Sequence, residues 1–171
     1  MKIIFLLSLL GLSIQVFSFT VDEGKKTLMP FKKELMGTLM GTMKKSGPVA
    51  AVEVCHLQAI PITKKHGAAV IGMGRTSHKL RNPKNAPRAW VRPYLEQFKL
   101  GKKKKALTLR LRDGHTGYLE PIYIQAKCLV CHGENISKSV AAVLKKNYPY
   151  DQAKGFKVGD FRGLFWLEVA K

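Results

Sequence analysis

The sequence has little cysteine, few acidic residues and no long apolar run. Its 171 residues include 3 cysteines, and an odd number leaves one thiol unpaired after any disulfide, so the cysteines need another explanation. No apolar stretch reaches the roughly 20 residues that a membrane span needs. There is also no internal repeat, low-complexity tract or internal linker, which excludes repeat and multidomain architectures. These absences leave one globular domain whose few cysteines serve a specific chemistry.

The first 18 residues predict export. Lys2 gives a positive start, and a short apolar run over 3–12 precedes the small or compact residues "VFS" at 16–18. This order is typical of a secretory signal peptide, whereas a retained membrane anchor would need a longer apolar run. We therefore predict a signal peptide at 1–18, a single mature domain at 19–171 and a periplasmic location.

The shortage of acids leaves a strongly basic chain. The 30 lysines and arginines against 11 acidic residues give a net charge of +19, or +18 once Lys2 is removed with the signal peptide. Nucleic acid is the usual partner of such a balance, but export argues against it. We expect an acidic redox partner or an anionic membrane surface instead, with general solubility as the alternative.

The order of apolar patterns predicts an α+β domain. Two helices open the mature chain, the second ended by Pro61, and strands with helical insertions follow. The predicted helices are 25–45, 48–60, 87–99 and 137–147, the last capped by Ser137. The predicted strands are 68–74, a hairpin over 106–126 with its turn at 113–114, and 161–170.

The second helix carries the isolated cysteine on a face of small residues. Ala51, Val52, Cys55 and Ala59 are three or four residues apart, so they share one side of the helix. His56 is rotated by about 100° from Cys55 around the helix axis, so it is expected on a different face. This face leaves room for a flat group to approach the sulfur.

The other two cysteines form the motif Cys128-Leu129-Val130-Cys131-His132. C-x-x-C-H is the attachment motif of haem c: two thiols bond the haem vinyl groups and the imidazole reaches the iron. We predict one covalent haem, with His132 as an iron ligand. The alternatives are a thioredoxin-like pair, which belongs near an early βαβ unit, and a zinc site of the three cysteines with His132 or His56.

Residue types alone do not identify the iron ligand opposite His132. Lone histidines and helical methionines are more often structural than ligands, and the small face around Cys55 singles it out. The candidates are Cys55, His56, His66, His78, His115, Met29, Met36, Met40, Met43 and Met73.

Four separated segments carry a family resemblance. "VAAVEVCHLQAIPI", "GRTSHKLRNPKNAPRAW", "PIYIQAKCLVCHG" and "YPYDQAKGFKVGDFRGLFWLEV" occur in that order over nearly the whole mature chain. They resemble the single-haem c-type cytochromes with a PAS-like fold, which occur as freestanding exported proteins and as sensor parts of histidine kinases. The resemblance implies a PAS-like antiparallel sheet with N-terminal helices, haem on Cys128 and Cys131, and His132 and Cys55 as axial ligands.

A thiolate ligand predicts a low reduction potential and a ferric resting state. We hypothesise that reduction frees Cys55, so that CO or NO can bind the ferrous haem and the helix moves. The predicted function is a redox or small-gas sensor with a signalling partner; the alternative is a low-potential electron-transfer cytochrome with a redox partner. We predict no enzyme activity. Arg75 and Arg81 either pair with the haem propionates or anchor loops.

Overall fold

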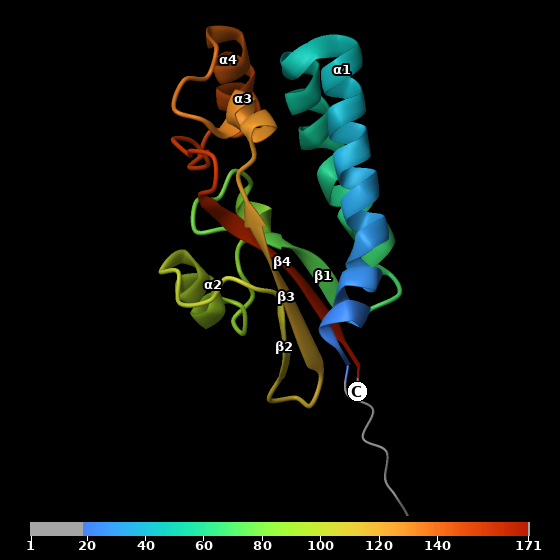
Figure 1. Ribbon diagram of the computed structural model, residues 1–171. Helices are drawn as coiled ribbons and strands as arrows, with labels where there is room; N and C mark the ends of the chain where they lie inside the picture. Colours follow the sequence, from blue (N-terminus) through green and yellow to red (C-terminus); the bar gives the residue numbers. More distant parts are fainter. Residues whose placement is uncertain (1–18, 171) are drawn as a thin grey trace, which may run out of the picture.

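The computed structural model describes residues 19–170, so the predicted signal peptide lies outside the described residues. The predicted α+β class is confirmed: helices surround one four-stranded antiparallel sheet (Figure 1). Within the described range, no helix has both the length and the apolar character of a membrane span. The elements are α1 (Val21–Gly67), β1 (Gly72–Thr76), η1 (Pro83–Asn85), α2 (Arg92–Lys99), β2 (Leu107–Arg110), β3 (Thr116–Tyr123), η2 (Ala126–Cys128), α3 (Leu129–His132), α4 (Lys138–Asn147) and β4 (Phe161–Val169).

Helix α1 is a hairpin of two helical halves. Thr20 caps its start: the Thr20 hydroxyl accepts from the backbone N–H of Glu23, and the Glu23 carboxylate accepts from the N–H of Thr20. Gly47 has φ 77° and ψ −179°, a conformation that essentially only glycine adopts. The chain reverses there, so the first half (21–46) and the second half (48–67) lie side by side (Figure 1). The predicted break between two helices is confirmed.

The prediction that Pro61 ends the second helix is wrong, because the helix continues to Gly67. A proline inside a helix removes one hydrogen bond to the carbonyl four residues earlier, here that of Leu57. Leu57 is 61% exposed and Pro61 is exposed too, so water can serve this carbonyl. Continuation also buries Ile62 in the core against the sheet.

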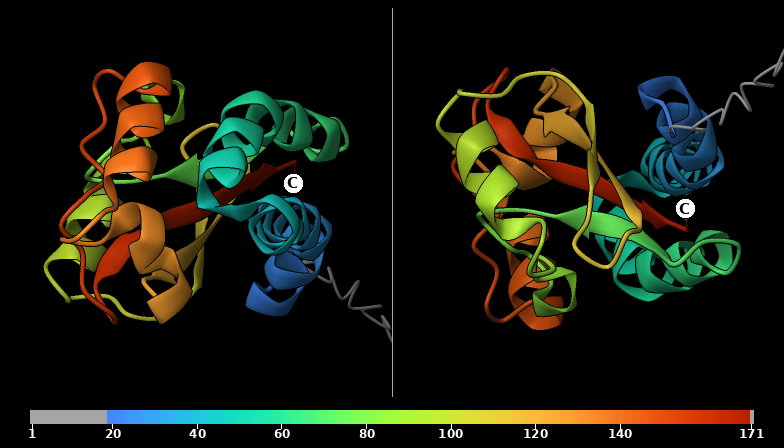
Figure 2. Two further views of the ribbon diagram at one scale, coloured as in Figure 1. Left: turned by 90° about the horizontal axis from the view of Figure 1, so that it is seen from above. Right: turned by 90° about the horizontal axis from the view of Figure 1, so that it is seen from below.

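The sheet has the strand order β1-β4-β3-β2, and its two faces carry separate cores. Tyr118 and Leu167 are register partners in β3 and β4, and both pack against α1. Their neighbours Leu119 and Leu164 point to the opposite face and pack against α2, because side chains alternate along a strand. The predicted hairpin and C-terminal strand are confirmed, and Figure 2 shows the sheet between these layers.

Two predicted boundaries and one predicted cap differ from the structure in detail. The strand predicted at 68–74 begins only at Gly72, because a turn in which the N–H of Val70 bonds to Gly67 O comes first. The helix predicted at 87–99 begins at Arg92, after a turn at 88–91. Ser137 is the N-cap of α4 as predicted, but its side chain caps no backbone N–H of the helix.

Glu34 ties the two halves of α1 together, which predicts a pH dependence of stability. Its carboxylate lies 2.9 Å from Lys65 Nζ and 2.7 Å from His66 Nε2. The hydrogen bond from Lys65, followed by that from His66, lowers the pKa of Glu34 below its usual 4.5. The stabilisation of the folded state by ionised Glu34 is therefore fully present above about pH 4.5, and it is lost as the pH falls through the lowered pKa.

We expect Glu34→Gln to reduce the melting temperature at neutral pH and to flatten its decline below about pH 4.5. Thermal unfolding followed by circular dichroism from pH 3 to pH 7 measures both effects. Glu134→Gln is the control, since Glu134 is exposed and its oxygen lies 3.7 Å from Lys157 Nζ. Parallel curves for wild type and Glu34→Gln would contradict the prediction.

Candidate functional site

A cavity lies between the two halves of α1, the α3–α4 segment and one end of the sheet. In Figure 1 these elements meet in the upper part of the molecule. Residues from five separate parts of the sequence line it. All six residues selected from the sequence do so: Cys55, Arg75, Arg81, Cys128, Cys131 and His132.

The C-x-x-C-H motif forms the short helical wall of this cavity. Cys128 ends η2, and Cys131 and His132 lie in α3, so the two sulfurs are one helical turn apart on one side. Gly133 then ends the turn by donating its N–H to Leu129 O at 2.9 Å. A Cβ at this position would lie 2.7 Å from the same oxygen, which explains the glycine after the motif.

His132 is held as a neutral imidazole with one nitrogen engaged. Its Nδ1 lies 2.8 Å from Ala153 O, and a carbonyl can only accept, so Nδ1 carries the proton. Burial first, followed by the positive charges of Arg81 and Arg162, lowers the pKa of His132 from 6.5 to about 2. The Nε2 lone pair is therefore available to a metal, in the arrangement that metal-binding histidines usually have.

Arg81 anchors the loop that orients His132. Its Nε lies 3.2 Å from Asp151 Oδ2, and its Nη2 donates to Cys131 O and to Ala153 O. Asp151 also accepts from the N–H of Ala153 at 2.8 Å. This corresponds to the loop-anchoring alternative for Arg81. A pairing of Arg81 with a propionate stays a prediction.

Arg75 has a different environment. Burial lowers the pKa of its guanidinium, and within residues 19–170 the structure shows no ion pair between it and a carboxylate. No aspartate or glutamate among the described residues lines the cavity. Arg75 is half-buried on the cavity wall, and a partly desolvated guanidinium without a carboxylate partner is suited to an anionic ligand. Arg75 is therefore available to an incoming carboxylate, and its pairing with a haem propionate stays a prediction.

Among the polar residues of the cavity that the sequence patterns did not indicate, Arg162 and Thr76 bear on its chemistry. Arg162, on β4, lines it and has its pKa lowered to about 10, mainly by burial and then by Arg81. Thr76 is 4% exposed, and its hydroxyl has no partner among the described residues. Arg162 stands within a run of aromatic strand residues, where the pattern indicated only core; Thr76 gave no signal in the sequence.

Cys55 lies on the cavity wall together with the small residues that share its helix face. Ala51, Val52 and Ala59 accompany it along the cavity wall, and Val52 packs against α4. Burial raises the pKa of the Cys55 thiol, partly offset by Arg75 and Arg81. Tyr148 lines the same wall, and burial together with Cys55 raises its pKa to about 12.

The zinc alternative is not supported by this geometry. A structural zinc ion needs four ligand atoms in one tetrahedral shell. Among the described residues, no three ligand atoms from cysteine, histidine, aspartate or glutamate come within 4.8 Å of one another at this cavity. The described cysteines are all free of disulfides. Cys55 lies on the α1 wall of the cavity, whereas Cys128, Cys131 and His132 lie together on the η2–α3 wall.

The other histidines are engaged elsewhere. His56 is exposed and its ring packs edge-on against Tyr148, His66 bonds Glu34, and His78 stacks on Phe161. Of the methionines, Met36, Met40 and Met43 line the cavity, whereas Met29 and Met73 do not.

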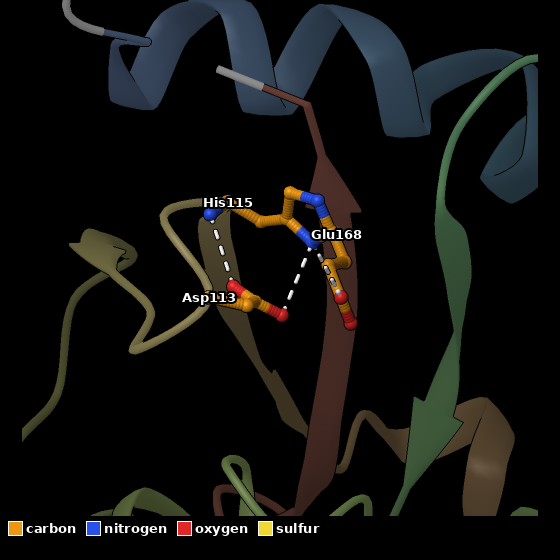
Figure 3. A group of neighbouring side chains, drawn as sticks. All are labelled: Asp113, His115 and Glu168. Carbon is orange, nitrogen blue, oxygen red and sulfur yellow. Dashed lines mark hydrogen bonds and ion pairs between the residues drawn. The ribbon is translucent and has the colours of Figure 1, made fainter.

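His115 belongs to a polar cluster away from the cavity. Its Nδ1 lies 3.2 Å from Asp113 Oδ2 and 3.3 Å from Glu168 Oε1 (Figure 3). The second oxygen of Glu168 already accepts from Trp90 at 3.0 Å and from Arg88 at 3.2 Å. Both oxygens of the buried Glu168 carboxylate therefore have hydrogen-bond partners, and Arg88 supplies a positive charge beside them. The cluster holds the β2–β3 turn against β4.

Comparisons with known proteins agree with this architecture. A family model described as Tll0287-like matches residues 18–170. A solved structure, that of the cyanobacterial haem protein Tll0287, is similar with 28% sequence identity and a TM-score of 0.64, over 89% of this chain and 97% of that chain. No curated protein matches the sequence.

Proposed function

The chain belongs to the Tll0287-like family, and from this premise we propose that it is an exported mono-haem c-type cytochrome that senses redox state or a small gas. The observation that carries the haem assignment is His132: its Nδ1 bonds Ala153 O at 2.8 Å and its Nε2 is free beside the two motif cysteines. The haem protein Tll0287, with a similar fold, supports the same assignment.

The residues of the cavity fit a covalent haem. Cys128 and Cys131 would hold the ring through thioethers, and His132 Nε2 would bind the iron from one side. Arg75, without a carboxylate partner among the described residues, is suited to a propionate, and Arg162 and the unpaired Thr76 hydroxyl offer further polar contacts. When bound, the haem supplies a one-electron Fe(III)/Fe(II) couple and a site for a diatomic gas.

Cys55 is the proposed ligand opposite His132. Its sulfur lies on a wall of small residues; burial raises the pKa of the thiol, and the positive charges of Arg75 and Arg81 partly offset this. A thiolate stabilises Fe(III), so we propose a ferric resting state with a low potential. Loss of this contact would release the second half of α1, which packs through Val52 on α4 and so links the ligand to the fold.

We further propose that the sheet and its helices form a PAS-like sensor domain in the periplasm, acting through a signalling protein. The antiparallel sheet with helices on both faces supports this. No catalysed reaction is proposed, because the described cavity wall has no carboxylate and no histidine besides His132. Electron transfer is the second candidate function. The net charge of +19 favours it, because a positive surface would steer the protein toward an acidic redox partner or an anionic membrane surface.

We expect Cys55→Ala to remove the low-spin ferric thiolate signature and to raise the reduction potential, since a neutral ligand stabilises Fe(III) less than a thiolate does. Absorption and electron paramagnetic resonance spectra of the purified holoprotein, with a redox titration, measure this. His56→Ala is the matched control, because the exposed His56 does not line the cavity. A thiolate signature that survives in Cys55→Ala would refute the assignment. Ferrous protein that binds no CO or NO would favour the electron carrier.

A further inference from the structure

We propose that Tyr148 is a positioning residue of this site, whose hydroxyl donates a hydrogen bond to Cys55 Sγ while that sulfur binds the iron. The inference rests on the proposed haem site and adds to it the group that sets the strength of the bond between iron and sulfur. Tyr148 directly follows α4, so this contact would also join α4 to the second half of α1.

The Tyr148 ring packs on the helical turn of α1 that carries Cys55. Val52, three residues before Cys55, belongs to the same buried cluster as Tyr148. His56, the residue after Cys55, meets the Tyr148 ring edge-on, with the ring centroids 5.2 Å apart. Contacts on both sides of Cys55 in the sequence therefore place this ring beside it, and Tyr148 and Cys55 line the same cavity.

The backbone around Tyr148 is held in place, so the ring has a fixed approach to α1. The side-chain amide of Asn147 donates to Glu53 Oε2 at 2.9 Å, which ties the end of α4 to α1 two residues before Cys55. The carbonyl of Tyr148 accepts from the N–H of Asp151 at 3.0 Å. Asp151 in turn pairs with Arg81 at 3.2 Å.

The hydroxyl of Tyr148 is available to a partner in the cavity. Tyr148 is 8% exposed, and a tyrosine hydroxyl that is largely removed from water usually has a hydrogen-bond partner. The hydroxyls of Tyr118 and Tyr123 have theirs in Glu120 and in the carbonyl of Lys104. Within residues 19–170 the structure shows none for Tyr148, and no carboxylate among these residues lines the cavity.

Charge and chemistry both point to the Cys55 sulfur as this partner. Burial first, followed by the negative charge of Cys55, raises the pKa of Tyr148 to about 12. A charge acts strongly on another group only at short range, so the phenol oxygen lies near the sulfur. A phenol keeps its proton at neutral pH and can donate it to a hydrogen bond, whereas a thiolate has only lone pairs and accepts.

Such a hydrogen bond would set the redox behaviour of the site. It withdraws electron density from the sulfur, so the thiolate donates less to Fe(III) and the reduction potential rises. It also weakens the bond between iron and Cys55, and so favours release of the sulfur on reduction. Tyr148 would act on the iron only through Cys55, as groups around metal ligands commonly do.

The test compares Tyr148→Phe with the wild type as full-length, haem-loaded proteins. Phenylalanine keeps the ring that packs on Val52 and His56 and removes only the hydroxyl. We expect the variant to keep a low-spin ferric thiolate signature in electron paramagnetic resonance, to have a more negative reduction potential and to show a higher iron–sulfur stretching frequency in resonance Raman spectra. This band should shift in D2O in the wild type and not in the variant.

Tyr150→Phe is the matched control. Tyr150 is two residues further along the chain, is 78% exposed and does not line the cavity. Its variant should have the wild-type potential, stretching frequency and D2O shift. Equal melting temperatures of the two variants and the wild type would show that the Tyr148→Phe effects do not come from loss of the fold.

The outcomes separate this inference from the proposed function. A wild-type potential and iron–sulfur frequency in Tyr148→Phe, with the thiolate signature intact, would overturn the inference alone. A changed CO stretching frequency in the ferrous CO complex, with the ferric properties unchanged, would overturn it too and assign the hydroxyl to the gas. Wild-type protein without a thiolate signature would overturn the inference together with the Cys55 assignment, and absence of covalent haem would refute the proposed function itself.

Discussion

We expect replacement of both Cys128 and Cys131 with serine to leave the protein without the proposed covalently bound haem. The two thiols are the only groups in the motif that can form thioethers with the vinyl groups, and serine hydroxyls do not substitute for them. We expect complete loss of haem staining after denaturing electrophoresis, where a non-covalent haem is removed. Single variants should retain at most one thioether and stain weakly.

Cys55→Ser is the matched control for this experiment, because it removes the third cysteine from the same cavity. Its haem staining should equal that of the wild type, since Cys55 is proposed to contact the iron and not the vinyl groups. Full staining of the Cys128→Ser, Cys131→Ser double variant would show that the haem is not held by this motif. Loss of staining in Cys55→Ser would show that the roles of the cysteines are misassigned.

Gly24→Ala is expected to cost about 3 kcal/mol in the free energy of unfolding, near the upper end of the usual range for overpacked cores. A Cβ at Gly24 would lie 2.4 Å from a ring carbon of Tyr118. Tyr118 is fully buried and donates its hydroxyl hydrogen to Glu120 at 3.0 Å, and Lys32 holds the other oxygen of Glu120. The ring cannot move aside without breaking this network, so α1 must separate from the sheet.

Gly37→Ala provides the control in the same half of α1. A Cβ there would meet nothing within 4 Å, and alanine is more favourable than glycine in an exposed helix by about 0.5–1 kcal/mol. Chemical unfolding followed by helix circular dichroism should therefore show opposite shifts for the two variants. Equal effects would mean that the packing of Gly24 on Tyr118 does not hold α1 to the sheet.

The cavity shows why some site residues were predictable and others were not. Cys128, Cys131 and His132 form a local motif whose spacing carries its chemistry, so the sequence suffices to select them. Cys55 was favoured because helical periodicity places small residues around it. Arg162 could not be selected in this way, since a strand pattern indicates which face a residue takes and not which distant loop it meets.

The elements of the fold also differ in whether the local sequence was enough to predict them. The hairpin over β2 and β3 and the strand β4 followed from local alternation and turn residues, which the sequence contains. The end of α1 did not, because the cost of Pro61 depends on whether the Leu57 carbonyl meets water, and that is a property of the packed molecule. Thr76 likewise became notable only when the strands around it buried its hydroxyl.

The sequence by itself determined the α+β class, the haem motif with His132 and the face of the helix that carries Cys55, because each depends on contacts between residues near in sequence. Only the tertiary structure decided that Cys55, Arg75 and His132 line one cavity and that Ala153 O fixes the imidazole. These depend on how the halves of α1 pair and how the chain closes over 151–153, and long-range packing alone sets both.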